Sequence, residues 1–547
     1  MPAPATPGPT PIPTPADFPV TWNSPEEAML HWAWEQQHMP LPITPLFASF
    51  VAPAIAGGLG SGLRALGAPV ASQQLRRLNT YGYMATVPDF ALIEGTPERV
   101  RQSVGERGFT MFQHWNEVLQ PKIEALNQRV VDFDYAGASD AALLAQLDFV
   151  VEATNEQWQI HFQLFPGFYI PAAFKDACAR LLGLEGLEAY EMMQGAPNLS
   201  VESGSKLWQL AHAASPLVRE TVHSMDGPAA LTKLRTSAEG QSFLRDLQAY
   251  LDVYGWRTGS FDVLEPLWVE NPAVALEHVR LMLGTPTDPA DEQRRGAERA
   301  ETLAGECRVR LAGNPAALGE FEALLAGARN FAPLLENHNF HIDTKGLAVA
   351  RFPFREAGRR MAAAGLVASA DDYAYLEAGE IRTFLNGDHT DRRALTAERK
   401  AEMEHWRGRI PPAELGARPP AGGEDPFELE FGGGQVEQSR DPKVVKGIPG
   451  ARGTVTGTAR VVRSLSEAGR VQEGDILICD MTTPAWTPLF ASLKAIVADS
   501  GGPLSHCAIV AREFGLPCVT ATRVGTQRIP DGATITVDGA QGLIRIE

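Results

Sequence analysis

The pattern of apolar positions divides the chain into a long helical part and a short β-rich part. Between residues 18 and 409, apolar residues recur at three- and four-residue spacings, which is typical of amphipathic helices. The clearest helical patterns are 140–159, 204–225, 237–253 and 314–326. We therefore predict a mostly α-helical domain over residues 18–409.

After about residue 444 the pattern changes to short runs of β-forming residues, separated by Gly and Asp-Gly turns. These runs are 453–462, 475–479, 495–498, 518–522, 534–537 and 543–546. One helical pattern, 505–514, lies between the third and fourth runs and ends at Gly515 and Pro517. The sequence thus predicts a multidomain protein with a compact C-terminal α/β domain over residues 441–547.

Two segments show no periodicity. Residues 410–440 are rich in Pro, Gly and acidic side chains, a composition typical of linkers. Residues 1–17 form a Pro-rich tract without the basic and apolar regions of a signal peptide, so we predict a disordered tail. No run of 18 residues is uninterruptedly apolar, and we therefore expect no membrane-spanning segment.

The net charge of −18 is unevenly distributed. Residues 441–547 hold 11 basic and 10 acidic residues, so the rest of the chain carries −19. A chain this acidic repels nucleic acids and anionic lipids, and we expect neither as a partner. Five scattered cysteines without CxxC spacing argue against a thiolate metal site and favour a reducing, cytoplasmic location. We predict no metal ligands.

The segment 494–522 holds the strongest candidate for chemistry. A predicted buried strand leads to Gly501 and Gly502, and a helix opens at Ser505 and His506. The first turn of a helix presents unpaired N–H groups and a positive dipole, which favour a phosphoryl group. An imidazole can act as a nucleophile at neutral pH. The residues alone leave two interpretations open, a phosphoryl carrier or a histidine that caps a helix.

The sequence GGPLSHCAIVAREFGLP at 501–517 resembles the swivelling phosphohistidine domain of the PEP-utilising enzymes. These include PEP synthase, pyruvate phosphate dikinase, rifampicin phosphotransferase and phenylphosphate synthase. Residues 481–488 and 447–450 resemble other parts of that domain, and Cys507 replaces a usual Ala. The resemblance implies that His506 carries the phosphoryl group. It also implies support of the phosphate site by Gly501, Gly502, Ser505 and Arg512.

The helical part is similar to the hydroxyl-acceptor domain of rifampicin phosphotransferase. The similar segments are 193–198, 207–211, 254–257, 266–272, 336–343, 355–360 and 371–376. Phenylphosphate synthase combines such a domain with the histidine domain on one chain and places the ATP-grasp domain on another. The resemblance therefore implies a separate ATP-binding subunit that holds ATP and Mg²⁺, with neither bound by this chain alone. The glycine-rich residues 57–62 do not fit a nucleotide loop and indicate either a flexible loop or close helix packing.

Transfer to a hydroxyl requires a base and donors for the phosphoryl charge. On one helix, His338 and His341 would share a face. Leu335 stands where rifampicin phosphotransferase has the Arg of an Arg-Glu pair, which favours His338 as the base for a phenol. A second interpretation treats both histidines as solvated. The substrate-binding candidates are Glu336, His341, Asp343, Lys345, Trp208 and Arg257.

We thus predict a dikinase-type phosphotransferase subunit. His506 would be loaded from ATP by the other subunit and would transfer the phosphoryl group to a phenolic or other aromatic hydroxyl. Two alternatives remain. The acceptor could be a rifamycin-like antibiotic or another alcohol, or the chain could be a phosphocarrier or regulatory protein that transfers nothing to a small molecule.

Overall fold

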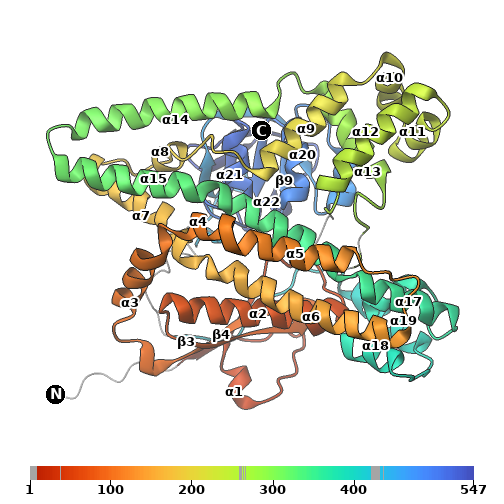
Figure 1. Ribbon diagram of the computed structural model, residues 1–547. Helices are drawn as coiled ribbons and strands as arrows, with labels where there is room; N and C mark the ends of the chain where they lie inside the picture. Colours follow the sequence, from red (N-terminus) through yellow and green to blue (C-terminus); the bar gives the residue numbers. More distant parts are fainter. Residues whose placement is uncertain are drawn as a thin grey trace, which may run out of the picture. The chain divides into compact units, whose positions relative to one another are not determined.

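The computed structural model describes residues 9–547 except 37, 258–260, 263, 265, 420–431 and 435. The chain divides into two compact units, which are treated separately below (Figure 1). Unit 1 comprises Met1–Pro166, Phe261–Leu264 and Lys345–Glu424, and unit 2 comprises Gly167–Ser260, Glu265–Thr344 and Asp425–Glu547. The predicted helical domain over 18–409 therefore contributes to both units, and unit 2 joins its middle part to the C-terminal domain.

Unit 1 contains a five-stranded antiparallel sheet that the sequence analysis missed. In sheet order the strands are β1 (Thr10–Pro11), β5 (Glu414–Arg418), β2 (His31–Trp34), β4 (Tyr81–Pro88) and β3 (Val70–Leu78). β3 and β4 form a hairpin through Asn79 and Thr80, whose φ angles are 47° and 73°. Both φ angles are positive, as in the turns that favour two-residue hairpins, but the usual Asn-Gly signal is absent.

Two predictions of irregular structure are wrong within the described residues. Thr10 and Pro11, in the predicted disordered tail, pair with Arg418 and Ala417 of β5. β5 itself lies in the predicted linker 410–440. Residues 1–8 and 420–431, where the rest of these predictions falls, lie outside the described residues.

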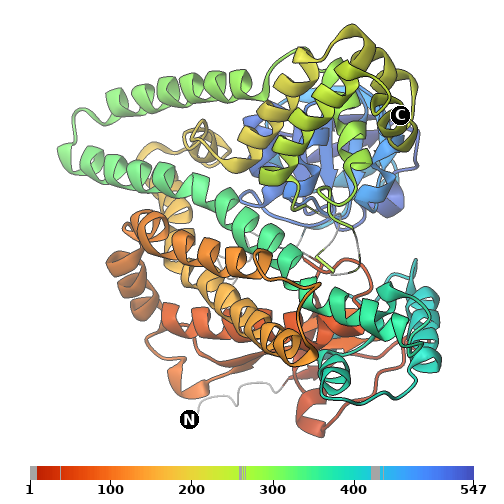
Figure 2. The same cartoon turned by 45° about the vertical axis from the view of Figure 1, so that its right-hand side comes forward.

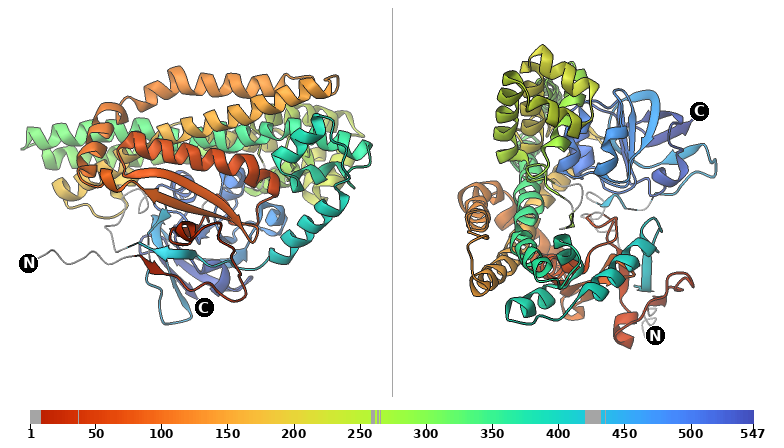
Figure 3. Two further views of the ribbon diagram at one scale, coloured as in Figure 1. Left: turned by 90° about the horizontal axis from the view of Figure 1, so that it is seen from below. Right: turned by 90° about the vertical axis from the view of Figure 1, so that its right-hand side faces the viewer.

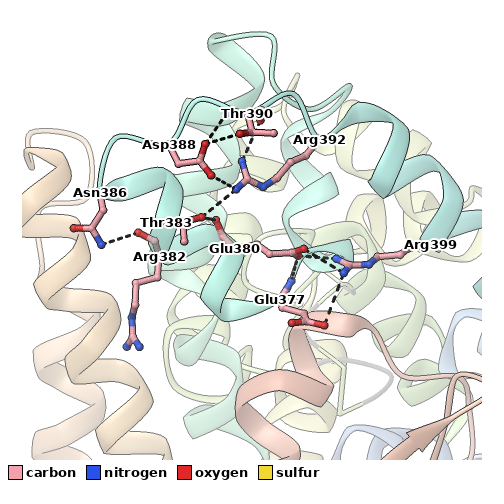
Figure 4. A network of polar contacts seen from close by, with 9 residues as sticks. All are labelled: Glu377, Glu380, Arg382, Thr383, Asn386, Asp388, Thr390, Arg392 and Arg399. Carbon is pink, nitrogen blue, oxygen red and sulfur yellow. Dashed lines mark hydrogen bonds and ion pairs between the residues drawn. The ribbon is translucent and has the colours of Figure 1, made fainter.

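The helices of unit 1 cover one face of its sheet, and Figure 3 shows the long helix α2 running along the strands. They are α1 (Pro25–Ala28), α2 (Pro45–Leu66), α3 (Thr96–Ser103), α4 (Met111–His114), α5 (Gln120–Val131), α6 (Asp140–Gln163), α16 (Leu347–Ala350), α17 (Phe352–Ala363), α18 (Ala378–Leu385) and α19 (Arg393–Trp406). A polar network joins α18 to α19 and the loop between them (Figure 4). Arg399 donates to Glu380, and Arg392 donates to Asp388 and Thr383.

Close helix packing explains the glycine-rich residues of α2. A Cβ atom at Gly58 would lie 2.4 Å from the carbonyl oxygen of Trp158 in α6, and one at Gly62 would lie 2.5 Å from that of Phe162. The helix-packing interpretation of this segment is therefore confirmed. α2 is also long and apolar enough to cross a membrane by length and composition, with a mean hydropathy of 1.6, which the sequence analysis overlooked. Of its most apolar stretch, 61% is buried inside the structure, as expected of a core helix.

The two adjacent glycines of α2 provide a matched pair for testing this packing. Gly58→Ala should lower the free energy of unfolding by about 1–3 kcal/mol, because the two helices must move apart. A Cβ atom at Gly57 would meet no other atom within 4 Å, so Gly57→Ala should raise that free energy by about 0.5–1 kcal/mol. Urea unfolding of the full chain measures both. Equal effects of the two substitutions would contradict the packing argument.

The helical part of unit 2 includes one long hairpin, α14 and α15, whose turn projects to the left in Figure 1. Its helices are α7 (Phe165–Leu182), α8 (Glu188–Glu191), α9 (Leu199–Ala213), α10 (Pro216–Ser224), α11 (Gly227–Leu234), α12 (Ala238–Tyr254), α13 (Pro272–Gly284), α14 (Pro289–Leu311) and α15 (Pro315–His338). The single helix predicted over 204–225 is two helices, α9 and α10. Ser215 caps the second one and Pro216 begins it, because Pro cannot continue a helix but suits a first turn.

The C-terminal part of unit 2 is an α/β domain with an eight-stranded sheet (Figure 2). In sheet order the strands are β6 (Val444–Lys446), β13 (Leu543–Ile546), β12 (Thr534–Asp538), β8 (Thr454–Val461), β9 (Ile476–Cys479), β10 (Ala495–Ala498), β11 (Cys518–Thr520) and β7 (Ile448–Ala451). Its helices are α20 (Thr487–Phe490), α21 (His506–Glu513) and α22 (Gly525–Arg528). All six predicted strand runs and the predicted helix are confirmed, whereas the short strands β6 and β7 and the short helices α20 and α22 were missed.

One hydrophobic core joins the two parts of unit 2. It includes Leu207 of α9, Leu251 of α12 and Val279 of α13, together with Leu489 of α20 and Val510 of α21. Figure 3 shows these helices beside the C-terminal sheet. The face of the α/β domain that bears α21 therefore packs against the helical part of the same unit.

Candidate functional site

His506 occupies the position that the sequence predicts, at the start of α21 after the glycine pair. Gly501 has φ +96°, and a Cβ atom there would lie 2.7 Å from Ser505 Oγ. The Ser505 hydroxyl donates to the Gly502 carbonyl at 2.7 Å. This side-chain hydrogen bond fixes the conformation of the loop. The loop places His506 in the first helical turn, where 9% of the surface of His506 is exposed.

A carboxylate from the helical part of unit 2 binds the His506 ring. Glu336, near the end of α15, places Oε2 2.8 Å from His506 Nδ1. Ser200 of α9 donates its hydroxyl to the same oxygen at 2.6 Å. On the other side of the ring, Thr487 Oγ1 lies 3.5 Å from Nε2. Glu336 Oε1 has no hydrogen-bond partner among the described residues.

The electrostatics of this pair determine which ring nitrogen can react. Burial raises the pKa of Glu336, but the charge and hydrogen bond of His506, the Ser200 hydroxyl and the charge of His338 outweigh it, so its pKa lies below the ordinary value. An ionised carboxylate only accepts hydrogen bonds, so Nδ1 carries the proton. In the neutral ring, Nε2 then holds the lone pair. The arrangement can therefore provide a nucleophilic nitrogen, whose ring Glu336 orients from the Nδ1 side.

Arg512 does not serve the phosphate site in the way that the resemblance implies. Its guanidinium donates to the carbonyls of Gly450 at 2.7 Å and Pro503 at 2.6 Å, and it lies 5.2 Å from the Tyr190 ring centroid. These donors are used to hold the glycine loop. Arg512 is a positioning residue for that loop.

The predicted cluster from Glu336 to Lys345 does not lie on one helix face. α15 ends at His338, and a π-helical turn, Asn339–Gly346, follows it. His338, His341 and Asp343 are 3%, 8% and 7% exposed, so the interpretation of solvated histidines is wrong. His338 Nδ1 lies 2.6 Å from the Leu334 carbonyl oxygen. The side chain of Glu336, which was predicted to bind substrate, contacts His506.

Two further candidates have surroundings of their own. Lys345 belongs to unit 1, where burial lowers its pKa and Glu124 partly opposes the effect. Trp208 donates its indole N–H to the Thr285 carbonyl at 2.9 Å and stacks on His212. These contacts give Trp208 a structural role. In the part of the chain that the structure describes, no group of three or more His, Cys, Asp or Glu residues is arranged to hold a metal ion.

Comparison with known proteins identifies both parts of this site. Residues 471–542 match the PEP-utilising enzyme mobile domain, and residues 159–336 match the rifampicin phosphotransferase fourth domain. The chain contains the mobile domain of the PEP-utilising enzymes. The resemblance drawn from the sequence is therefore confirmed. His506 lies in the first match and Glu336 ends the second, so their hydrogen bond links the two matched domains.

Several named relatives support this assignment. Chondramide synthase cmdD of Chondromyces crocatus is 32% identical over 98% of this chain and 14% of its own length. The uncharacterized phosphotransferase YvkC of Bacillus subtilis is 28% identical over 94% of this chain and 62% of its own. A rifampicin phosphotransferase of Streptomyces sviceus is 30% identical over 64% of this chain and 40% of its own length. The chain therefore spans less than two thirds of each of these relatives.

The mobile domain has a second, polar contact with the helical part that the sequence analysis missed. Gln194 donates to the Arg512 carbonyl at 2.5 Å, and the Gly195 N–H donates to Glu513 Oε1 at 3.2 Å. Arg452 forms ion pairs with Glu188 and Glu191 of α8. Nothing in the local sequence of these segments predicts such pairing, because the partners are far apart in the chain.

Glu513 makes this contact sensitive to pH. Burial raises its pKa to about 7 and the nearby Glu336 adds to the rise, against the opposing effects of Gly195, Gln293 and Arg512. A carboxyl group with a raised pKa stabilises the folded chain below its ordinary pKa of about 4.5, and that stability is lost as pH rises through about 7.

Glu513→Gln should remove this pH dependence, because an amide of the same shape does not ionise. We expect the wild-type chain to lose up to about 3 kcal/mol of stability between pH 4.5 and 8 relative to the variant. Thermal unfolding across this pH range measures the difference. Glu467→Gln, at an exposed position of the same domain, is the control and should leave the wild-type profile unchanged. Parallel wild-type and Glu513→Gln profiles would disprove the assignment.

Proposed function

We propose that this chain is a phosphotransferase of the PEP-utilising type, in which His506 carries a phosphoryl group to a hydroxyl held by the helical part of unit 2. The observation that supports the proposal is the hydrogen bond between Glu336 and His506 Nδ1 at 2.8 Å. It orients the ring and leaves Nε2 as the nucleophile. Relatives named as phosphotransferases and the two matched domains favour the same reaction class.

In the loading step, Nε2 of His506 attacks a phosphoryl donor, and an N–P bond replaces the donor's O–P bond. Glu336 keeps the proton on Nδ1, so the electron pair on Nε2 is available for the attack. The Nδ1–H bond also makes the ring a better leaving group in the next step. The donor in our proposal is ATP, bound with Mg²⁺ on a separate ATP-binding subunit. Attack on its β-phosphorus releases AMP, and water then hydrolyses the bond to the γ-phosphoryl group and releases phosphate.

In the transfer step, the acceptor oxygen attacks the phosphorus and the bond from Nε2 breaks, returning its electron pair to the ring. The hydroxyl proton passes to solvent, because Glu336 binds the ring at Nδ1, on the side opposite to the attacking oxygen. The His506 ring leaves as the uncharged tautomer with the proton on Nδ1. The Glu336 carboxylate, whose pKa is lowered, holds that proton in place.

The acceptor in our proposal is a phenol or another aromatic alcohol. Aromatic rings accompany the polar groups that follow α15: the Phe168 ring lies 5.5 Å from that of His338, and the Phe340 ring lies 5.4 Å from that of His341. Such rings suit a flat acceptor. The names of several relatives give a rifamycin-like acceptor as the second candidate.

An acceptor assay separates these possibilities. The full chain is incubated with the ATP-binding subunit and ATP labelled at the β-phosphate, and then with phenol, with a rifamycin or with no acceptor. We expect label on the chain first and on phenol afterwards. Label that moves only to the rifamycin would select the second acceptor. Label that stays on the chain with every alcohol tested would instead indicate a phosphocarrier, and no label on the chain would refute the proposed function.

A further inference from the structure

Arg257 is a buried cation to which no counter-ion is bonded among the described residues. Its side chain is fully buried, with 0% of its surface exposed, just beyond the end of α12. None of its three guanidinium nitrogens has a hydrogen-bond partner within the same described part of the chain. Its own carbonyl accepts from the Trp268 N–H at 3.1 Å, which holds the backbone in place.

The polar neighbours of Arg257 are bonded to other groups. The Tyr250 hydroxyl pairs with Ser203 at 2.9 Å, and the Tyr254 hydroxyl donates to Glu202 at 2.5 Å. Burial lowers the pKa of Arg257, and the charge of Glu336 offsets this only in part. The Phe340 ring centroid lies 5.9 Å from the guanidinium carbon.

His278 does not compete with Arg257 as a cation. It is buried, its ring stacks on Trp268 with centroids 4.4 Å apart, and burial together with the charge of Arg257 lowers its pKa to about 3. At neutral pH the ring is uncharged. Arg257 is therefore the positive group of this buried cluster, and its five N–H donors face no acceptor among the described residues.

An unpaired buried guanidinium raises the free energy of the folded state, because no hydrogen bonds replace those that the group made with water. Such a group is stable when an anion completes its coordination, and the planar fork of Arg suits two phosphate oxygens at once. Arg257 interacts electrostatically with Glu336, whose Oε2 binds His506. The anion that reaches this cluster in the proposed reaction is the phosphoryl group.

We propose that the Arg257 guanidinium is the phosphoryl-binding cation of this site, which holds the equatorial phosphoryl oxygens while the group moves from His506 to the acceptor. This inference rests on the proposed function. Arg257 would then act as a catalytic residue that stabilises the charge of the transferred group.

The first test uses inorganic phosphate and does not depend on turnover. Arg257→Met should be at least as thermally stable as the wild-type chain in phosphate-free buffer, because a buried unpaired charge is removed. Millimolar phosphate should raise the melting temperature of the wild-type chain and not that of the variant. Arg245→Met, on α12, is the control and should respond to phosphate like the wild type.

The second test is single-turnover transfer from the phosphorylated chain to the acceptor. Arg257→Met should load His506 and then transfer the label about 10²- to 10³-fold more slowly than the wild type. Arg257→Lys keeps the positive charge but lacks the planar guanidinium group, and it should recover part of the wild-type transfer rate. If the wild type does not load at all, the proposed function fails, whereas the phosphate test still decides the site.

Two results would overturn the proposal for Arg257. One is an equal response to phosphate in the wild type and in Arg257→Met. The other is a destabilised Arg257→Met chain together with a normal rate of transfer in Arg257→Lys. Either result would assign Arg257 a purely structural role.

Discussion

His506→Asn should reduce incorporation of label from ATP into the chain to background. The substitution removes the only group that the proposed reaction phosphorylates, while an amide still offers an N–H near Glu336. Transfer to any acceptor should fall with it, because the acceptor receives its phosphoryl group from this ring. The measurement is acid-sensitive, base-stable label on the intact protein, which distinguishes phosphohistidine from phosphoserine.

The matched control for this experiment is His223→Asn, an exposed histidine at the end of α10 in the same unit. It should load like the wild type. Both variants should melt cooperatively, which shows that loss of label is not loss of the fold. Retained labelling of His506→Asn would disprove the proposed carrier.

Glu336→Gln should lower the rates of both loading and transfer by up to about 10⁴-fold, the loss expected when the carboxylate that orients a catalytic histidine becomes an amide. An amide of the same shape can still bond to His506 Nδ1 and Ser200, so the ring stays in place. What the variant loses is the negative charge that keeps the proton on Nδ1. Single-turnover labelling of the chain and of the acceptor measures the two rates.

The pH profile of transfer tests the same role. The pKa of Glu336 is lowered, so the carboxylate that holds Nδ1 stays ionised at neutral pH, and the wild-type rate should fall only as the solution becomes acidic. Glu336→Gln should lack this acidic limb. Glu320→Gln, exposed on the same helix, serves as the control and should keep the wild-type profile. An unchanged rate in Glu336→Gln would exclude a role for this carboxylate in orienting the ring.

Much of the mobile domain was predictable because the sequence patterns that determine its elements are local. The glycine loop, the helix start at His506 and the six strand runs each depend on a few consecutive residues, and the structure has them where the sequence places them. The sheet of unit 1 was missed because its strands come from distant segments, 10–11 and 414–418 among them. Its hairpin also turns through Asn79 and Thr80 without a glycine.

The sequence by itself determined the elements of the mobile domain and the identity of the candidate reactive histidine, since periodicity, capping and turn residues act within one segment. Only the tertiary structure decided which groups meet at that histidine. Glu336 and His506 are 170 residues apart, and the sequence pattern equally allowed His338 as the base. The burial of Arg257 is likewise a result of tertiary packing. Side chains from remote segments come together through the packing of whole helices and sheets. Local sequence patterns do not predict these long-range contacts.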